Sequence, residues 1–381
     1  MKSIINKALE NGGGQNRTQQ PEINAQQIIS PDEEELRKLV EQLKVNIKIV
    51  GCGGGGSNTI TRLSEAGVYG AELIAANTDA PHLIHVKANR KILLGKRLTR
   101  GLGAGADPRI GEEAAKEADE ELRNILQRSD IVFITAGMGG GTGTGSAPYV
   151  ARVAKETNTG NLVIGIVTLP FSAEGRVRME QALYGLDLLR KYCDTTVVIP
   201  NDKLLEIVPR LPLNQAFKVA DEVLMEALKG LTEIITKPGL VNIDYADIKT
   251  IMANGGVAMI GIGESENSTD RVQEAVNDAI NSPLIEADIH QARGALVRIV
   301  GDPNMSVSEA QRAAELISKQ INPNAKLIWG ASIDPEMENK VKVLIVLTGV
   351  KSPYILNGKA SLTEMKKAAH ISGLDTSIDS L

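Results

Sequence analysis

Gly139-Gly140-Gly141-Thr142-Gly143-Thr144-Gly145-Ser146-Ala147-Pro148 is the stretch that decides the fold of this chain. Glycine is entropically costly in regular structure, so a cluster of this kind indicates close approach of the main chain to another group. An apolar, strand-like segment at 131–134 precedes the stretch, and a helix-like segment follows from about Ser146. A strand, a glycine-rich loop and a helix N-terminus in this order predict an anion site, because free N–H groups and the positive helix end face a phosphate. A flexible surface loop is the alternative interpretation.

The composition is that of a globular protein with an aliphatic core. Of 381 residues, 42% are hydrophobic and only 3% aromatic, and the net charge is −5. This balance argues against a nucleic-acid partner, because both a basic surplus and stacking aromatics are missing. Two cysteines, Cys52 and Cys193, make no disulfide framework and favour a cytoplasmic protein. We expect no direct membrane insertion, because no apolar stretch approaches about 20 residues.

Strand-like and helix-like segments alternate from Val45 onward. Helices are expected at about 58–66, 112–126 and 146–156, and strands at 45–49, 73–76, 92–94, 131–134, 162–167 and 196–199. This alternation predicts an α/β fold with a mostly parallel sheet and helices on both faces. Ligands bind such sheets at the carboxyl ends of the strands, so we expect the glycine-rich and polar loops to meet at one crevice.

A long helical pattern at 213–236 separates this region from a second one. It ends at Pro238-Gly239, and at 1.5 Å per residue it would extend ~36 Å, enough to join two domains. Beyond it, a smaller α+β domain is expected from strands at 257–262, 295–300, 326–330 and 341–346 and helices at 271–280 and 308–317.

The ends of the chain are polar. Ser30-Pro31-Asp32-Glu33 has the pattern of a helix start, with Ser30 as cap and Pro31 in the first turn. The chain is therefore expected to divide into a mobile arm with an N-terminal helix (1–43), a nucleotide-binding domain (44–212), a central helix (213–237), a C-terminal α+β domain (238–350) and a flexible tail (351–381).

A second glycine-rich segment, Gly51-Cys52-Gly53-Gly54-Gly55-Gly56, contains the G-x-G-x-x-G pattern, and Asp79 follows the next strand. This pattern predicts a dinucleotide site, and hence an NAD-dependent oxidoreductase, as one function. The glycine-rich stretch at 139–145 weighs against it, because one nicotinamide-binding half needs only one phosphate cradle. The four histidines also fall in no catalytic arrangement. No lysine closes either loop, so backbone N–H groups, helix dipoles and a metal ion would meet the phosphate charge.

Taken together, the glycine-rich and polar motifs resemble the tubulin/FtsZ family of GTPases. The matching segments are 51–58, 77–80, 101–105, 139–148, 169–178, 200–204 and 242–247. The resemblance spans about residues 44–350 and is stronger to FtsZ, in its archaeal branch, than to eukaryotic tubulin. It implies a Rossmann-like GTP-binding domain of the tubulin type, GTP or GDP with Mg²⁺ as ligands, and head-to-tail polymerisation into protofilaments. It also implies a mid-cell division ring, with membrane-tethering and division proteins as partners.

The resemblance further implies which residues contact the nucleotide. Ala104 and Gly105 would lie by the γ-phosphate, and Glu174 and Arg178 would reach the ribose and phosphate side. Asn201 and Phe217 would hold and stack the base. The phosphate contacts would come from Gly54, Gly55, Gly56, Ser57, Asn58, Gly141, Thr142, Gly143, Thr144 and Gly145.

Asp221 is implied to read the base. A carboxylate accepts from guanine N1–H and N2–H₂ together, a pattern that adenine does not offer. Simpler interpretations stay open: Asp221 as a solvated helix carboxylate, Phe217 as a core residue, and Glu174 with Arg178 as a surface ion pair.

Asn242, Asp244 and Asp247 carry the hydrolysis hypothesis. The resemblance implies that this loop positions the attacking water on the GTP of the next subunit, which makes the contact head-to-tail and the polymer open. Asp244 as a helix N-cap with Asp247 in the first turn is the alternative. A GTP-binding regulator that does not polymerise would need neither carboxylate.

Two residues depart from the family pattern. Ser57 stands where Gly or Asn is usual and is small enough to fit. Asp107 stands where Asn is usual beside the γ-phosphate loop. A carboxylate there could repel phosphate or help recruit Mg²⁺, and the sequence leaves both open.

Overall fold

The structure, a computed structural model, describes residues 44–207, 213–237, 239–266 and 270–351. The chain divides into two units, 1–44 and 45–381, and everything below concerns the second. The helix expected to begin at Ser30 and the tail beyond residue 351 lie outside the described residues.

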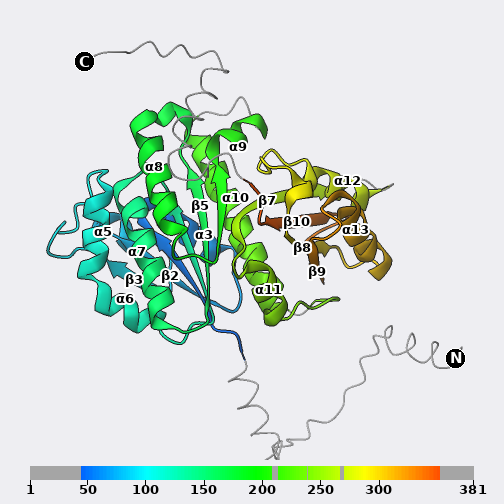
Figure 1. Ribbon diagram of the computed structural model, residues 1–381, viewed down its shortest axis with the longest axis horizontal. Helices are drawn as coiled ribbons and strands as arrows, with labels where there is room; N and C mark the ends of the chain where they lie inside the picture. The colour runs from blue at the N-terminus through cyan, green and yellow to red at the C-terminus, as the bar shows by residue number, and fades with distance from the viewer. Residues whose placement is uncertain (1–43, 208–212, 238, 267–269, 352–381) are drawn as a thin grey trace, which may run out of the picture. The chain divides into compact units, whose positions relative to one another are not determined.

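A sheet of ten strands runs through the described part of this unit, in the order β3-β2-β1-β4-β5-β6-β7-β10-β8-β9 (Figure 1). Its first seven strands in this order pair in parallel, whereas β10 is antiparallel to β7 and β8. This confirms the mostly parallel α/β fold. The strands are β1 (Ile47–Cys52), β2 (Ala71–Asn77), β3 (Arg90–Leu93), β4 (Ile131–Gly137), β5 (Leu162–Leu169), β6 (Thr195–Pro200), β7 (Gly256–Ser265), β8 (Gly294–Gly301), β9 (Lys326–Ile333) and β10 (Val341–Thr348).

Helices cover both faces of the sheet because its strands are apolar on both sides. Ile49 of β1 belongs to a core with α3 (Gly53–Glu65), α10 (Leu213–Thr236) and α11 (Tyr245–Met252). Its neighbour Val50 belongs to the opposite core. That core includes α5 (Pro108–Glu117), α6 (Asp119–Leu126), α7 (Gly141–Thr157) and α8 (Arg176–Leu189). A third core lies under α12 (Arg271–Ile280) and α13 (Val307–Gln320), and the short helices are α4 (Ala80–His85) and α9 (Asn201–Ile207).

The helices at the glycine-rich segments begin earlier than the sequence predicted. Helix α3 starts at Gly53 rather than near 58, and α7 starts at Gly141 rather than near 146. Glycine has a low helix propensity, so the sequence predicted loops at these positions, but tertiary packing overrides this propensity and places the glycines in helices. A Cβ on Gly145 would lie 2.0 Å from the Pro108 carbonyl oxygen, so α7 meets α5 through glycine. The single helix expected at 112–126 is also two helices, with a break at Ala118.

Helix α10 has the extent that the sequence predicted, 213–236. The four strands expected beyond it are β7, β8, β9 and β10, which confirms the smaller α+β region. Two ion pairs join α10 to this region: Arg298 to Glu233 at 2.6 Å and Lys342 to Glu226 at 2.6 Å.

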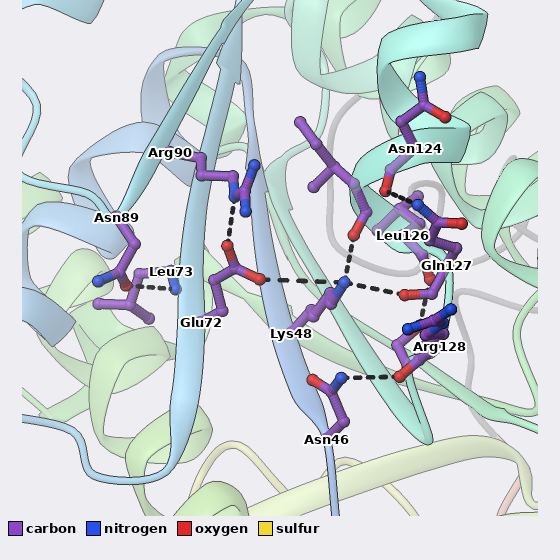
Figure 2. Close-up of polar contacts among 12 residues, drawn as sticks. Asn46, Lys48, Glu72, Leu73, Asn89, Arg90, Asn124, Leu126, Gln127 and Arg128 are labelled. Atoms are coloured by element: carbon purple, nitrogen blue, oxygen red, sulfur yellow. Dashed lines mark hydrogen bonds and ion pairs between the residues drawn. The ribbon is translucent and has the colours of Figure 1, made fainter.

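Charged residues at the amino ends of β1, β2 and β3 form a closed network, shown in Figure 2. Lys48 Nζ donates to the carbonyl oxygens of Ile125 and Gln127 at the end of α6 and lies 3.9 Å from Glu72 Oε2. Arg90 Nε contacts the other oxygen of Glu72 at 2.5 Å. Burial lowers the pKa of Lys48, a shift that Glu72 opposes. The network satisfies carbonyls that the helix end leaves unpaired.

Candidate nucleotide-binding site

A cavity of about 360 Å³ lies at the carboxyl ends of the parallel strands. Segments that follow β1, β4, β5 and β6 all reach it, together with the first turns of α10, as expected for a parallel sheet. Its lining consists of Gly54, Gly55, Asn58, Gly137, Met138, Gly140, Gly141, Thr142, Gly143, Thr168, Pro170, Glu174, Arg178, Asn201, Phe217, Ala220 and Asp221.

Two helix N-termini meet beside the cavity. A Cβ on Gly53, where φ is +71°, would lie 2.7 Å from the Gly143 nitrogen, so α3 and α7 start in contact. Gly54 and Gly140 have nothing within 4 Å of a Cβ position, and both line the cavity. Free N–H groups and two positive helix ends therefore surround open space, which is the donor set that a polyphosphate requires.

Hydroxyl groups hold the glycine-rich segment in shape. Thr144 Oγ1 accepts from the Gly139 N–H at 2.8 Å, and Thr142 Oγ1 lies 2.6 Å from Thr78 Oγ1. Thr144 is 1% exposed and does not line the cavity, whereas Thr142 does. The two threonines therefore divide into one that closes the loop and one that faces the ligand space.

An aromatic ring and a buried amide are also among the residues that line the cavity. Phe217 is 38% exposed and packs edge-on against Phe171, with ring centroids 5.1 Å apart. This exposure overturns the interpretation of Phe217 as a core residue. Asn201 is 5% exposed, and its Oδ1 has no hydrogen-bond partner in the described part of the chain. A buried, unpaired acceptor beside a partly exposed ring fits a base that brings its own donors.

Asp221 faces the same space from α10. Burial raises the pKa of Asp221 to about 6, although Arg62 Nε lies 3.8 Å from Oδ2 and favours the ionised form. The Asp221 side chain is only 23% exposed, lines the cavity and lies beside Arg62, so its surroundings are not those of a fully solvated helix carboxylate. Among the described residues, Arg62 is the cation that pairs with this carboxylate, and the paired N–H groups of guanine would supply two further donors.

Glu174 and Arg178 were interpreted either as a surface ion pair or as contacts to the ribose and phosphate side of the nucleotide, and the structure is compatible with both. Arg178 Nε lies 3.0 Å from Glu174 Oε2, and Glu174 Oε1 accepts from the Phe171 N–H at 2.8 Å. Both side chains also line the cavity. They therefore form an ion pair whose charged groups border the ligand space.

Six of the expected contact residues do not line the cavity: Gly56, Ser57, Thr144, Gly145, Ala104 and Gly105. Several of them shape it indirectly. A Cβ on Gly56 would lie 2.5 Å from the Thr135 carbonyl oxygen, and Ser57 is 0% exposed, so both serve the packing of α3. The Ala104 Cβ would lie 3.0 Å from a Cβ on Gly141, which places the 101–107 loop against the start of α7.

The Asp107 carboxylate is occupied by its own helix. It accepts from the Arg109 N–H at 2.9 Å as the N-cap of α5 and pairs with Arg109 Nη2 at 2.8 Å. The Arg109 side chain, followed by its N–H, lowers the pKa of Asp107. The negative charge that departs from the family pattern is thus matched by a neighbouring guanidinium.

Asn242, Asp244 and Asp247 lie at the other edge of the sheet. Asp244 is the N-cap of α11, accepting from the Ala246 N–H at 3.4 Å, and Asp247 is in the first turn. Asn242 Oδ1 accepts from the Gly239 N–H at 2.7 Å. All three residues are exposed. The N-cap interpretation of Asp244 is thus what the structure shows, and it leaves the Asp247 carboxylate facing solvent.

Two contacts fix α11 at the amino ends of the strands. Tyr245 Oη donates to the carbonyl of Asp130, just before β4, at 3.2 Å. Lys249 Nζ donates to the carbonyl of Gly160, just before β5, at 2.6 Å. The cavity is at the carboxyl ends of the same strands, so the structure separates the candidate catalytic residues from it.

Six lining residues were not among the expected contacts: Gly137, Met138, Gly140, Thr168, Pro170 and Ala220. Position gave the available signal, since Thr168 and Pro170 stand where β5 ends and Ala220 lies one helical turn after Phe217. In the described ranges, no group of three or more His, Cys, Asp or Glu residues is arranged to hold a metal ion. None of the described helices is long and apolar enough to cross a membrane.

Comparisons with known proteins agree with this geometry. Residues 46–209 match the tubulin/FtsZ family GTPase domain, and residues 256–351 match the FtsZ family C-terminal domain. Cell division protein FtsZ 1 of Archaeoglobus fulgidus is 52% identical, covering 94% of this chain and 96% of its own. The FtsZ 1 protein of Methanocaldococcus jannaschii is 56% identical, covering 85% and 88%.

Solved structures give the same result. An empty FtsZ dimer of M. jannaschii superposes with a TM-score of 0.80 at 56% identity, covering 84% of this chain and 92% of that one. A GTPγS-bound protofilament of CetZ2 from Haloferax volcanii superposes with a TM-score of 0.71 at 20% identity, covering 87% and 100%, which is a likeness of fold.

Proposed function

The chain belongs to the tubulin/FtsZ family, and from this premise we propose that it is a cell-division GTPase that assembles head-to-tail into protofilaments. It carries the GTPase domain of that family, so it binds and hydrolyses GTP. The NAD-dependent oxidoreductase is thereby set aside. The glycine-rich segment after β1 serves one cradle together with the segment after β4.

The proposal rests on two polar side chains at the cavity, Asn201 and Asp221, whose hydrogen-bonding capacity is not filled by the described residues. Asn201 Oδ1 has no donor among the described residues, burial raises the pKa of Asp221 to about 6, and Phe217 lines the same cavity. Guanine would satisfy the carboxylate with two N–H groups, and its π face would meet the ring. Adenine would offer the carboxylate no such pair of donors, which is how a buried polar site rejects the wrong base.

The phosphates would lie against the N-termini of α3 and α7. Gly54 and Gly140 leave room there for direct main-chain donation, and Glu174 with Arg178 would border the ribose and phosphate side. Transfer of the γ-phosphoryl group to water needs positioning and charge stabilisation rather than covalent chemistry. The N-termini of α3 and α7 would supply both the positioning and the charge stabilisation without a change in backbone conformation.

Mg²⁺ is proposed to arrive with the nucleotide. In the described residues the carboxylates that line the cavity are Glu174, paired with Arg178, and Asp221, at the base end. Such a donor set fits a magnesium ion held by phosphate oxygens and water, as is usual for this cation. When bound, the ion neutralises charge that develops on the transferred group.

Catalysis is proposed to be completed between subunits. Asp247 and Asp244 lie at the amino ends of the strands, away from the cavity, and Asp247 is exposed. A second copy stacked in the same orientation would bring this edge against the cavity of its neighbour. The carboxylates and Asn242 would then orient the attacking water. Such a heterologous contact does not close on itself, so it produces a filament.

In the cell we place the filament in a mid-cell division ring in the cytoplasm, with membrane-tethering and division proteins as partners. We also propose the division into a GTP-binding domain at 44–212, a central helix at 213–237 and a C-terminal domain at 238–350. The two family matches, 46–209 and 256–351, and α10 between them support this division.

The test is GTP hydrolysis per subunit as a function of protein concentration, with light scattering followed in parallel and ATP as the control nucleotide. Turnover that appears above a threshold, together with scattering and with GTP alone, is the expected result. A rate per subunit that is constant from the lowest dilution upward, without scattering, would instead indicate a GTP-binding regulator that works as a monomer.

A further inference from the structure

Three side chains connect β2 to the nucleotide cavity through consecutive hydrogen bonds. Asn77 Oδ1 accepts from the Asp79 N–H at 3.3 Å, and Asn77 Nδ2 lies 3.0 Å from His82 Nδ1. His82 Nε2 lies 3.0 Å from Oδ1 of Asn58, which lines the cavity from α3. His82 also borders an adjoining cavity of about 560 Å³, which Asn58 shares.

The direction of this chain of bonds is fixed at its buried end. Asn77 is 3% exposed, and its Oδ1 is occupied by a backbone N–H, so Nδ2 faces the imidazole. An amide nitrogen only donates, so His82 Nδ1 must accept, and the ring proton therefore sits on Nε2. Nε2–H then donates to Asn58 Oδ1.

The ring itself is held at a rigid place. The His82 backbone N–H donates to Asp79 Oδ1 at 2.8 Å, and Asp79 is the N-cap of α4. Asp79 therefore caps the helix that carries the imidazole, and its own N–H binds Asn77 at the buried end of the chain of bonds. A side chain whose own support is locked in this way can hold a neighbour in one orientation.

The consequence falls on Asn58. With Oδ1 bound by the imidazole, the group left over is the Nδ2 amide, for which the described residues provide no hydrogen-bond partner. We propose that His82 is a positioning residue for the nucleotide, because it orients the Asn58 amide so that its NH₂ group donates to acceptor atoms of the bound guanosine. The inference rests on the proposed GTP site and assigns a determinant of affinity within it.

The test is GDP affinity, measured by fluorescence titration below the concentration at which the protein assembles. His82→Leu removes both ring nitrogens and is expected to weaken binding about three- to tenfold, the value of one hydrogen bond. His82→Gln keeps one acceptor for Asn77 and one donor for Asn58, so its affinity is expected to stay within about twofold of the unmodified chain.

A double-mutant cycle separates positioning from general structure. In an Asn58→Ala background, His82→Leu should cause no further loss, because its effect passes through Asn58. An additive loss in that background, a His82→Gln variant as weak as His82→Leu, or an unchanged His82→Leu would each overturn the inference. Failure of the unmodified chain to bind GDP would instead contradict the proposed function.

The tautomer gives a readout that needs no variant. Nitrogen-15 chemical shifts of the histidine rings in the folded, unmodified protein distinguish the two neutral forms. A proton on Nε2 of His82 is the expected result, and a proton on Nδ1 would overturn the inference.

Discussion

At the amino ends of β1, β2 and β3, Glu72 pairs with Lys48 and Arg90, and Lys48 also donates to two carbonyls at the end of α6 (Figure 2). At the carboxyl end of the same sheet, Asn201 Oδ1 has no partner among the described residues, and Asp221 has a raised pKa. One edge is satisfied by the protein itself. The other is left with polar groups that only a ligand completes, and this is the physical mark of a binding site.

The side of the sheet at which the parallel strands begin also contains polar groups that are not paired in this way. Helix α11 lies there too, and in the described ranges neither Asp244 nor Asp247 forms an ion pair. The network near β1 thus supports the fold, whereas the exposed Asp247 carboxylate, without an ion-pair partner among the described residues, can act on another molecule. The comparison predicts different outcomes for substitutions at the two edges.

The largest effect is expected for Asp247→Ala. Loss of a group that positions water should lower GTP turnover about a thousandfold, while GDP affinity and assembly stay unchanged, because the residue lies away from its own chain's cavity. Turnover and GDP titration measure the two quantities. Glu315→Ala, an exposed carboxylate on α13, is the matched control and should leave both unchanged. Equal loss in the control would refute the role of Asp247.

Two glycines of the same stretch should separate stability from binding. Gly145→Ala places a Cβ 2.0 Å from the Pro108 carbonyl oxygen and should lower the free energy of unfolding by about 3 kcal/mol. At Gly140 a Cβ meets nothing within 4 Å, and φ is −91°, so the fold should tolerate alanine. Because Gly140 lines the cavity, alanine there should weaken GDP binding about tenfold. Denaturant unfolding measures the stability and GDP titration the affinity of each variant. A stability loss in Gly140→Ala and an affinity loss alone in Gly145→Ala would contradict this assignment.

Asp221→Asn should weaken GDP binding about tenfold and reduce the preference for guanine over adenine. The unmodified chain should also lose affinity as pH falls below about 6, because only the carboxylate accepts both guanine donors. The asparagine variant should lack that pH dependence. Titration from pH 5 to pH 8, within roughly one to two pH units of the raised value, tests both. A pH-independent unmodified chain would contradict this role.

The same substitution should stabilise the ligand-free chain. The folded pKa of Asp221, about 6, is above the ordinary value of 3.8, so the charged form destabilises the folded state. Stability from this group therefore rises as pH falls from about 6 toward 4. Near neutral pH, Asp221→Asn should raise the melting temperature without ligand, a trade of stability for function.

The smallest effect on nucleotide binding is expected for the network of Lys48, Glu72 and Arg90 at the amino ends of the strands. Lys48→Met leaves the carbonyls of Ile125 and Gln127, at the end of α6, without this donor and should lower the free energy of unfolding by about 2 kcal/mol. GDP affinity should not change, because Lys48 lies at the amino ends of the strands, away from the cavity. A loss of affinity at constant stability would show that the two edges are not independent.

Much of this architecture could be predicted from the sequence because its signals are local. The alternation of strands and helices gave the parallel sheet, and apolar spacing gave α10 with its observed limits, 213–236. The starts of α3 and α7 were wrong because glycine propensity says nothing of the contact between Gly53 and Gly143. The hydrogen bonds that join Asn77, His82 and Asn58 were also invisible, since they join residues of three elements at fixed distances.

The residues of the site could be predicted where a sequence motif contains them. They could not be predicted where the three-dimensional arrangement determines whether a residue lines the cavity or packs between helices. Gly56 and Gly145 belong to glycine-rich motifs, yet they serve helix packing, and only the backbone around them shows this. Met138 and Ala220 line the cavity without any signal of their own residue type.

The central claim is that the active site is divided between the two edges of neighbouring subunits, and mixing two impaired variants tests it most directly. One variant carries Asp247→Ala, and the other carries Gly140→Ala with Asp221→Asn. Each alone should hydrolyse GTP slowly, but in an equal mixture roughly a quarter of the head-to-tail contacts would combine an intact cavity with an intact α11. Turnover well above the sum of the separate rates is the predicted result. A mixture that assembles yet shows only that sum would contradict a shared active site.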